Sequence, residues 1–357
     1  MKMYVPTLFF CFLISGCAKE QIIDRIKIMD SIGYDMDGDT FRSSSSYAAY
    51  EKKTRLRLFT AESKTFKGVW IPFAAQSDAQ VVVGQLRTFV ISEKFARRSI
   101  QELASSLLRD PLVSNNATVL ITKQKASEIV SDIARNPPFF LSDMVKQNME
   151  DGNTPFTNTH QLLDQYYGEG QDVFLPVLNK NKNGLLQMDG VGVFKGDKLR
   201  LMLTDKEAFF LKLLKDKPGT MTGYYDFITE QKEKIAFKIL QGKRNLSPKQ
   251  HDKVVISLML HIEPREIPKT KSIIDKSDFL DLKKQIEQHV SNEINVLLKT
   301  FQMNNVDPVG FGELFRSRER TWNEQEFSKK TYANLKFEVK TEITITQSGV
   351  GIGAEQH

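Results

Sequence analysis

Residues 191–214 read VGVFKGDKLRLMLTDKEAFFLKLL, and this stretch places a β-hairpin directly before a helix. Apolar residues alternate with other residues over 191–194 and again over 199–203, on either side of the pair Gly196 and Asp197, which is the pattern of a hairpin. Thr204 and Glu207 then stand three residues apart before an apolar run, and this capping-box spacing predicts a helix start at the exit of the hairpin.

Downstream of this stretch, the sequence predicts one long amphipathic helix and two strands. The helix spans Phe279 to about Gln302, because apolar residues recur every three or four positions there and form one stripe that we expect to face the core. Strands are predicted at 254–262 and at 337–345. The second strand alternates apolar residues with Lys, Glu and Thr, so one face is expected to be buried and the other wet.

Upstream, the sequence predicts alternating strands and helices. An apolar strand is expected within residues 21–34, and a plain turn follows at Asp35 to Asp39, whose glycine comes too early for a calcium loop. Residues 43–46, SSSS, are interpreted as a short polar loop. A helix is predicted over Glu93–Leu108, then a strand at 117–121 and a helix over 124–134 that ends before Pro137 and Pro138.

These segments predict an α+β protein of two to three domains, with mixed or antiparallel sheets partly covered by helices and a long amphipathic helix in the C-terminal half. The expected division is a signal peptide at residues 1–16, an N-terminal domain at 17–204 and a C-terminal domain at 205–357. The boundary is placed after the hairpin, near Asp205.

The first seventeen residues have the features of a lipoprotein leader. Lys2 provides a charged start, an apolar run from Met3 to Ile14 is too short to span a bilayer, and Ser15 and Gly16 precede Cys17. Small residues directly before a cysteine at the end of such a run are typical of a lipobox. We expect Cys17 to accept an S-diacylglyceryl group and an N-acyl chain such as palmitate, and two or more acyl chains hold a protein stably on a membrane. The alternative is an ordinary cleaved signal peptide with an incidental cysteine.

Composition excludes several classes of function. The chain has 357 residues and a formal net charge of +6, and export makes nucleic acid an implausible partner for that charge. Both cysteines, Cys11 and Cys17, lie in the leader region, so we expect no disulfide in the mature protein. Five scattered histidines form no metal-ligand spacing, and no cofactor is expected. The sequence contains no GxSxG, SxxK or HExxH motif, so we expect no enzymatic activity. A hydrolase of the envelope that uses paired carboxylates stays open as an alternative, because acidic residues are plentiful.

Several motifs, in this order, resemble the C-subunit lipoproteins of spore nutrient-germinant receptors, the Ger(x)C (GerAC-like) family. They are the lipobox that ends at Cys17, the strand through Gly33 and Tyr34, residues 190–198 (GVGVFKGDK), residues 307–312 (DPVGFG), Trp322 and the closing strand that reaches Gly349. This sequence departs from the family pattern at Ala18 and Lys19, where Trp and Asp are usual, and at Val309, where an aromatic residue is expected.

The resemblance implies a lipid-anchored subunit of a receptor with two membrane-embedded partners, A and B, on the outer face of the spore inner membrane. It implies no catalytic residue and only one functional position, Cys17. Gly310 and Gly312 are expected to adopt positive φ, and Trp322 to fill a gap in the core.

Two further hypotheses remain open. The chain could be a lipid-anchored solute-binding protein, which would have two α/β lobes joined by a hinge. The basic groups Arg97 with Arg98, and Arg316 with Arg318 and Arg320, are either solvated or in contact with a membrane or partner.

Overall fold

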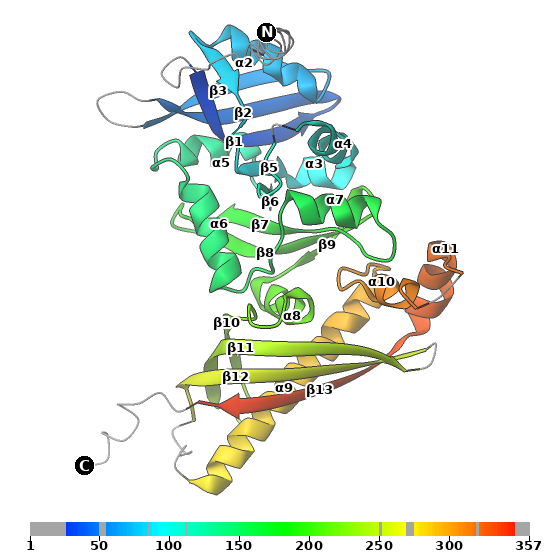
Figure 1. The fold of residues 1–357 in the computed structure, drawn as a ribbon. Coiled ribbons are helices and arrows are strands. Elements are labelled where there is room, and N and C mark those ends of the chain that lie inside the picture. Colours follow the sequence, from blue (N-terminus) through cyan, green and yellow to red (C-terminus); the bar gives the residue numbers. More distant parts are fainter. Residues whose placement is uncertain are drawn as a thin grey trace, which may run out of the picture.

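The computed structural model describes residues 26–49, 55–84, 86–111, 113–249, 252–268, 275–318 and 321–346. Within them the chain forms two sheets with helices packed on their faces, and it extends from an N-terminal region through a middle region to a C-terminal sheet (Figure 1). The expected α+β fold with mixed sheets is confirmed. The two sheets differ in size and strand order, unlike the pair of similar lobes expected of a solute-binding protein.

The larger sheet has nine strands and is mixed. Its strands lie in the order β3 (Arg55–Ser63), β2 (Thr40–Ala49), β1 (Ile26–Asp37), β5 (Thr88–Ser92), β6 (Thr118–Thr122), β7 (Phe174–Lys180), β8 (Leu186–Lys195) and β9 (Lys198–Leu203), and β4 (Gln80–Val82) also pairs with β1. The central strands β1, β5, β6 and β7 run parallel, whereas both flanks are antiparallel. The predicted hairpin is β8 and β9, and its turn is at Gly196 and Asp197.

Helices cover both faces of this sheet because its central strands are apolar on both sides. In β5, Phe89 and Ile91 face one core, while Val90 faces the other. The first core is covered by α2 (Trp70–Ala75), α3 (Glu93–Arg98), α4 (Gln101–Arg109) and α7 (Thr159–Tyr167), and the second by α5 (Ala126–Ile133) and α6 (Phe140–Glu150). A short 3-10 turn at Lys67–Val69 leads into α2.

The C-terminal sheet has four strands in the order β10 (Gly223–Ile228), β11 (Lys234–Lys249), β12 (Lys253–Glu266) and β13 (Lys336–Ile345). The long helix α9 (Lys276–Met303) lies across one face of it, as predicted, and buries its stripe of Leu282, Ile286, Val290, Ile294, Leu297, Leu298 and Phe301. The remaining elements are α10 (Phe311–Arg316), α11 (Glu324–Glu326), a π-helical turn at Phe327–Thr331 and a 3-10 turn at Tyr332–Asn334.

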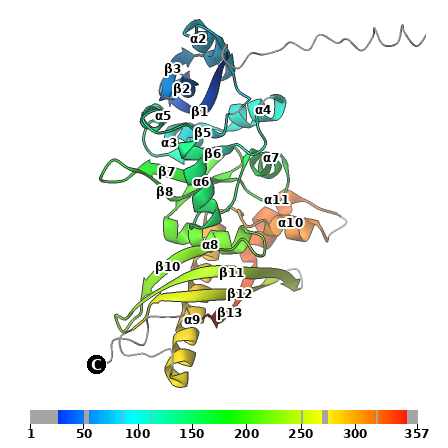
Figure 2. The same ribbon diagram turned by 60° about the vertical axis from the view of Figure 1, so that its left-hand side comes forward.

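Helix α8 (Asp205–Lys215) lies between the two sheets (Figure 2). It begins with the predicted capping box, in which the Thr204 hydroxyl accepts from Glu207 N–H and the Glu207 carboxylate accepts from Thr204 N–H. Residues 208–214 are all buried, and they pack against strands of both sheets. A helix that is buried on every side acts as a shared core element, so α8 joins the two sheets into one core.

Two sequence-based expectations about secondary structure are wrong. Residues 43–46 form part of β2 and not a loop, because Ser43 and Ser45 satisfy their buried hydroxyls by donating to the carbonyls of Gly33 and Ser31, both at 2.9 Å. The helix expected over 93–108 is two helices, α3 and α4. It breaks at Ser99, which is extended (φ −178°, ψ 139°), and the next residue, Ile100, donates its N–H to Asp197 O at 2.8 Å.

Outer strands of both sheets have backbone groups capped by side chains. Such strands otherwise present free N–H and C=O groups to neighbouring molecules. The caps are Gln76, which donates to and accepts from the backbone of Thr60 in β3; Asn153 Oδ1, which accepts from Tyr224 N–H in β10 at 3.0 Å; and Glu287 Oε1, which accepts from Ile343 N–H in β13 at 2.8 Å.

Candidate functional site

The functional position expected from the sequence, Cys17, lies outside the described residues, as does the rest of the leader. The described chain begins with β1 at Ile26, nine residues after Cys17. Within the described chain, four of the six buried charged residues gather where the larger sheet meets α8 and the DPVGFG segment, namely Asp172, Lys212, Asp216 and Asp307, whereas Asp30 and Asp35 lie in β1. This junction is the candidate site.

Asp172 and Asp307 bind each other's backbone at this junction. Asp172 N–H donates to Asp307 O at 2.9 Å, and Asp307 N–H donates to Asp172 Oδ2 at 2.6 Å. Asp172 precedes β7 of the larger sheet, while Asp307 follows the long helix α9 of the C-terminal region. These paired hydrogen bonds therefore fix the two regions in one relative position.

The Asp307 carboxylate also folds the loop that follows it. Oδ1 accepts from Gly310 N–H at 2.8 Å and Oδ2 from Gly312 N–H at 2.9 Å, so the side chain fixes the first turn of α10. Gly310 has φ +87°, as expected from the sequence. The same expectation is wrong for Gly312, which needs to be glycine because a Cβ there would lie 2.6 Å from the Cα of Gly170.

Burial controls the ionisation of the groups at the junction. It raises the pKa of Asp307 to about 6, against the hydrogen bonds from backbone N–H groups, which lower it. Burial likewise raises the pKa of Asp172, while the Lys195 ammonium, 3.1 Å from Asp172 Oδ2, favours the carboxylate. The pKa of Tyr332 is raised well above its usual value by burial, and its hydroxyl donates to Val306 O at 2.7 Å.

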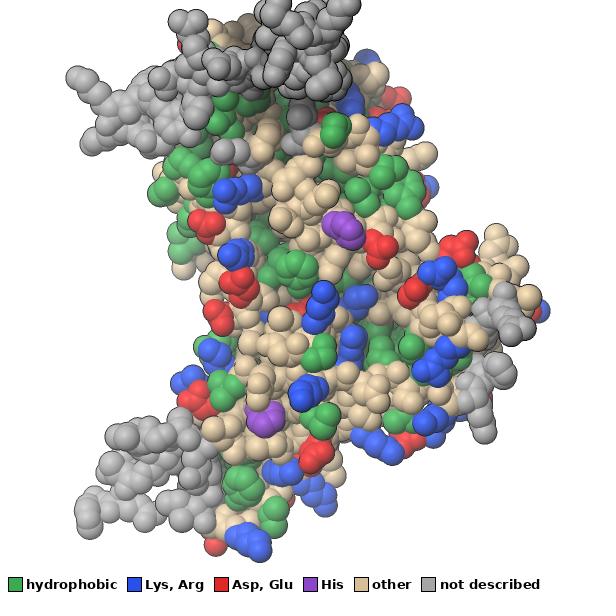
Figure 3. All heavy atoms as spheres, in the orientation of Figure 1, with side chains coloured by type: hydrophobic (Ala, Val, Ile, Leu, Met, Phe, Trp, Pro, Cys, Tyr) green, Lys and Arg blue, Asp and Glu red, His purple; other side chains and the backbone are tan. Residues whose placement is uncertain are grey.

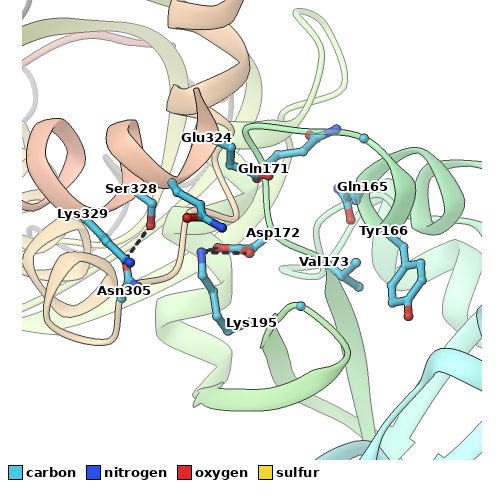
Figure 4. A pocket seen from close by; sticks show the side chains of 13 residues that line it. Gln165, Tyr166, Gln171, Asp172, Val173, Lys195, Asn305, Glu324, Ser328 and Lys329 are labelled. Atoms are coloured by element: carbon cyan, nitrogen blue, oxygen red, sulfur yellow. Dashed lines mark hydrogen bonds and ion pairs between the residues drawn. The ribbon is translucent and has the colours of Figure 1, made fainter. Parts of the chain in front are cut away.

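A cleft of about 410 Å³ opens beside this junction. Figure 4 shows side chains from both regions on its walls, with Lys195 directed at Asp172 and Ser328 bonded to Asn305. Glu324, at the rim, accepts from Gly170 N–H at 3.2 Å. The carboxylates here accept hydrogen bonds that hold the backbone, so the arrangement is suited to fixing two parts of the chain together.

Trp322 packs against the core, as predicted from the sequence. Its ring lies 5.1 Å from that of Phe327 and packs against the C-terminal core. The indole N–H is buried and finds no acceptor among the described residues.

A second buried charge pair, Lys212 and Asp216, was not expected from the sequence. Lys212 is fully buried in α8, and its ammonium donates to Met149 O at 2.6 Å and to Gly152 O at 2.8 Å, at the C-terminal end of α6. Asp216 Oδ2 lies 3.8 Å from the same nitrogen. The sequence does indicate a buried charge here, because Lys212 is the single charged residue inside the apolar run 209–214.

The described residues contain no group of three or more His, Cys, Asp or Glu side chains that could hold a metal ion. Arginines in both basic groups form ion pairs within the chain: Arg97 with Glu93, Arg98 with Asp39 and Arg316 with Glu313. In the described ranges, no helix combines the length and the apolar character needed to cross a membrane.

Comparison with known proteins matches nearly the whole chain to one family. A family model described as the spore germination protein N-terminal domain matches residues 19–180, and a second, described as spore germination B3/GerAC-like, C-terminal, matches residues 189–349. Similar curated proteins include the spore germination protein GerQC of Bacillus cereus, with 28% identity over 98% of this chain and 99% of the relative. Spore germination protein KC of Bacillus subtilis (strain 168) has 20% identity over 89% of this chain and 79% of the relative.

The fold has a counterpart among solved structures. The crystal structure of the GerBC protein has a TM-score of 0.57 and 14% identity, and the match covers 88% of this chain and 97% of that one. The two chains therefore share the same fold.

Proposed function

This chain belongs to the family of GerAC-like spore germination proteins, and from that premise we propose that it is the lipid-anchored, non-catalytic subunit of a spore nutrient-germinant receptor. The observation that carries the proposal is the position of the family match. It begins at residue 19, two residues after Cys17, so the sequence matched to the family directly follows the predicted lipobox. A tether of a few residues would hold the protein at a membrane surface through acylated Cys17.

The role we propose is assembly, with membrane-embedded A and B subunits as partners on the outer face of the spore inner membrane. Two features of the described chain support a scaffolding role. The buried carboxylates of Asp172 and Asp307 bind backbone N–H groups, and the buried ammonium of Lys212 binds backbone carbonyls. Through these hydrogen bonds, the buried charged groups stabilise the fold.

Replacement of Cys17 by Ala tests the anchor. We expect the Cys17→Ala protein to be exported but lost from the membrane fraction, because without the thiol no diacylglyceryl group can be attached. Spores that carry it, in a strain without other receptors, should respond poorly to nutrients. Cys11→Ala is the matched control, since it removes the other cysteine from the apolar part of the leader and should leave anchoring unchanged.

Two measurements decide between the outcomes. Mass spectrometry of the membrane-extracted protein should show a mature N-terminus at acylated residue 17, and a different N-terminus would overturn the anchor. Affinity purification from detergent-solubilised spore membranes should recover two multi-span membrane proteins with the wild-type chain. Recovery of neither of them would refute the receptor-subunit role.

A further inference from the structure

Helix α2 presents an apolar face to its surroundings, in the part of the fold where the described chain begins. Val69 and Phe73, four residues apart, are fully buried in the core of the larger sheet, whereas Ile71 lies on the opposite side and is 77% exposed. The next turn places Ala74 and Ala75 on the outer side as well, and both are exposed. Exposed apolar residues that are grouped in this way and surrounded by polar residues are typical of an interaction surface.

The rim of this face combines an indole ring with two lysines. Trp70 is partly exposed, and its ring packs edge-on against Phe73 with 6.0 Å between the ring centroids. Lys64 and Lys67 are exposed just before the helix, and Lys67 Nζ lies 3.9 Å from a carboxylate oxygen of Asp110. Indole rings and lysines beside exposed apolar residues are the combination that suits the headgroup region of a bilayer.

The start of β1 keeps this face within reach of the expected anchor. Ile26 pairs with Gln80 in β4, and the Lys27 ammonium lies 3.2 Å from Asp78, three residues after the end of α2. Figure 2 shows α2 together with β1, β2 and β3 at one end of the molecule. Nine residues lead from Cys17 to Ile26, and an extended chain of that length spans at most about 32 Å. A chain anchored at Cys17 therefore has α2 close to the membrane.

The opposite end of the molecule has a different surface. Figure 3 shows charged side chains of both signs spread over the outer face of the C-terminal sheet. Among them, the Glu338 carboxylate lies 2.5 Å from the Lys253 ammonium and 2.8 Å from that of Lys340. Transfer of such charged groups out of water is costly, so this end is suited to solvent and the α2 end to an apolar boundary.

We propose that the exposed face of α2 rests on the membrane surface. Ile71 and Trp70 lie at the boundary between headgroups and acyl chains, and Lys64 and Lys67 lie against the phosphate groups of anionic lipids. A negatively charged bilayer attracts lysines close to it, and the apolar side chains leave water when they enter the boundary. The inference rests on the proposed anchor and deepens it: the acyl chains hold the protein at the membrane, and α2 determines which side of the protein faces the lipid.

Tryptophan emission tests this contact, because the chain has two tryptophans and only Trp70 lies in the proposed contact. The full-length acylated chain is placed in vesicles of phosphatidylcholine and phosphatidylglycerol, with or without lipids that carry bromine on their acyl chains near the headgroup. In the Trp322→Phe protein, which keeps Trp70, brominated lipids should lower the emission at least about twofold, because the indole lies at the headgroup boundary. The Trp70→Phe protein, which keeps Trp322, should retain its emission.

Substitution of Ile71 separates the contact from the fold. In the Trp322→Phe background, Ile71→Asp places a charge on the contact face, so the quenching of Trp70 should fall about twofold or more. The melting temperature in detergent should stay unchanged, because the Ile71 side chain is exposed. Leu185→Asp is the matched control: it changes another exposed apolar residue, in the turn between β7 and β8, and should leave the quenching as it is.

Flotation of the vesicles on a density gradient distinguishes the outcomes. A chain that floats with the vesicles while Trp70 stays unquenched overturns the lipid contact, leaves the anchor intact and favours a protein partner on this face. A chain that does not float overturns the anchor and this inference with it. Equal quenching of the two single-tryptophan proteins, or full quenching of Trp70 in the Ile71→Asp protein, refutes the assignment of the contact to α2.

Discussion

Replacement of Asp307 by Asn should destabilise the fold, although it changes only one atom of the side chain. The carboxylate accepts one hydrogen bond on each oxygen, from Gly310 N–H at 2.8 Å and from Gly312 N–H at 2.9 Å. An amide has one acceptor oxygen, so one of the two N–H groups would face the amide nitrogen of Asn and remain unsatisfied.

The size of the effect follows from those two contacts. A hydrogen bond to a charged group contributes roughly 1.5–3 kcal/mol, and a buried donor left unpaired costs about 1–3 kcal/mol. Removal of a buried charge offsets part of this loss, since burial already raises the pKa of Asp307 to about 6. We expect a net loss of about 2–3 kcal/mol in the free energy of unfolding, and a larger loss for Asp307→Ala, which removes both acceptors and leaves a cavity.

Tryptophan fluorescence provides the assay, because the chain has two tryptophans, Trp70 and Trp322, in different regions. In a Trp70→Phe background the signal comes from Trp322, near the junction, and the melting temperature should fall by about 2–4 °C per kcal/mol. Asp197→Asn, in the hairpin turn, is the matched control and should stay within about 0.5 kcal/mol of the parent. An Asp307→Asn protein that unfolds within about 1 kcal/mol of its parent would refute the role assigned to this carboxylate.

Two further predictions concern neighbouring residues. Burial raises the pKa of Asp216 to about 6, so the stabilisation that this protonated group provides is full below about pH 4 and is lost as pH rises through 6. The free energy of unfolding of Asp216→Asn, measured in urea, should therefore be higher relative to that of the wild type at pH 7.5 than at pH 5. A difference between the two proteins that does not vary with pH would contradict this. Gly312→Ala should lower the free energy of unfolding by about 1–3 kcal/mol, because the new Cβ would meet Gly170. Gly84→Ala, which has open space around it, should leave this free energy unchanged. Equal melting temperatures of the two variants would argue against the close contact at Gly312.

The elements that were predictable from the sequence are those whose signal is local. The hairpin of β8 and β9, the capping box at Thr204 and the stripe along α9 each depend on spacing within a few residues. Local pattern failed where a distant partner decides the structure. Ser43 and Ser45 look like loop residues until the carbonyls of β1 accept their hydroxyl protons.

The junction was out of reach for the same reason. Asp172 and Asp307 are 135 residues apart, and no sequence pattern around either residue predicts that the two are in contact. Lys212 carried a weak signal, because a charged residue inside an apolar helix requires partners, but the sequence does not identify the carbonyls of Met149 and Gly152. The anchor at Cys17, by contrast, is an expectation from the leader alone and lies outside the described residues.

The caps on the outer strands bear on how copies of this protein would behave when crowded on a surface. Tethered molecules meet one another at high local concentration, and exposed strand edges would then join neighbours into continuous ladders. Gln76, Asn153 and Glu287 already occupy backbone groups at three outer strands, so a neighbouring strand would first have to displace a bonded side chain. Dense packing on a two-dimensional support is therefore compatible with each copy remaining a separate molecule.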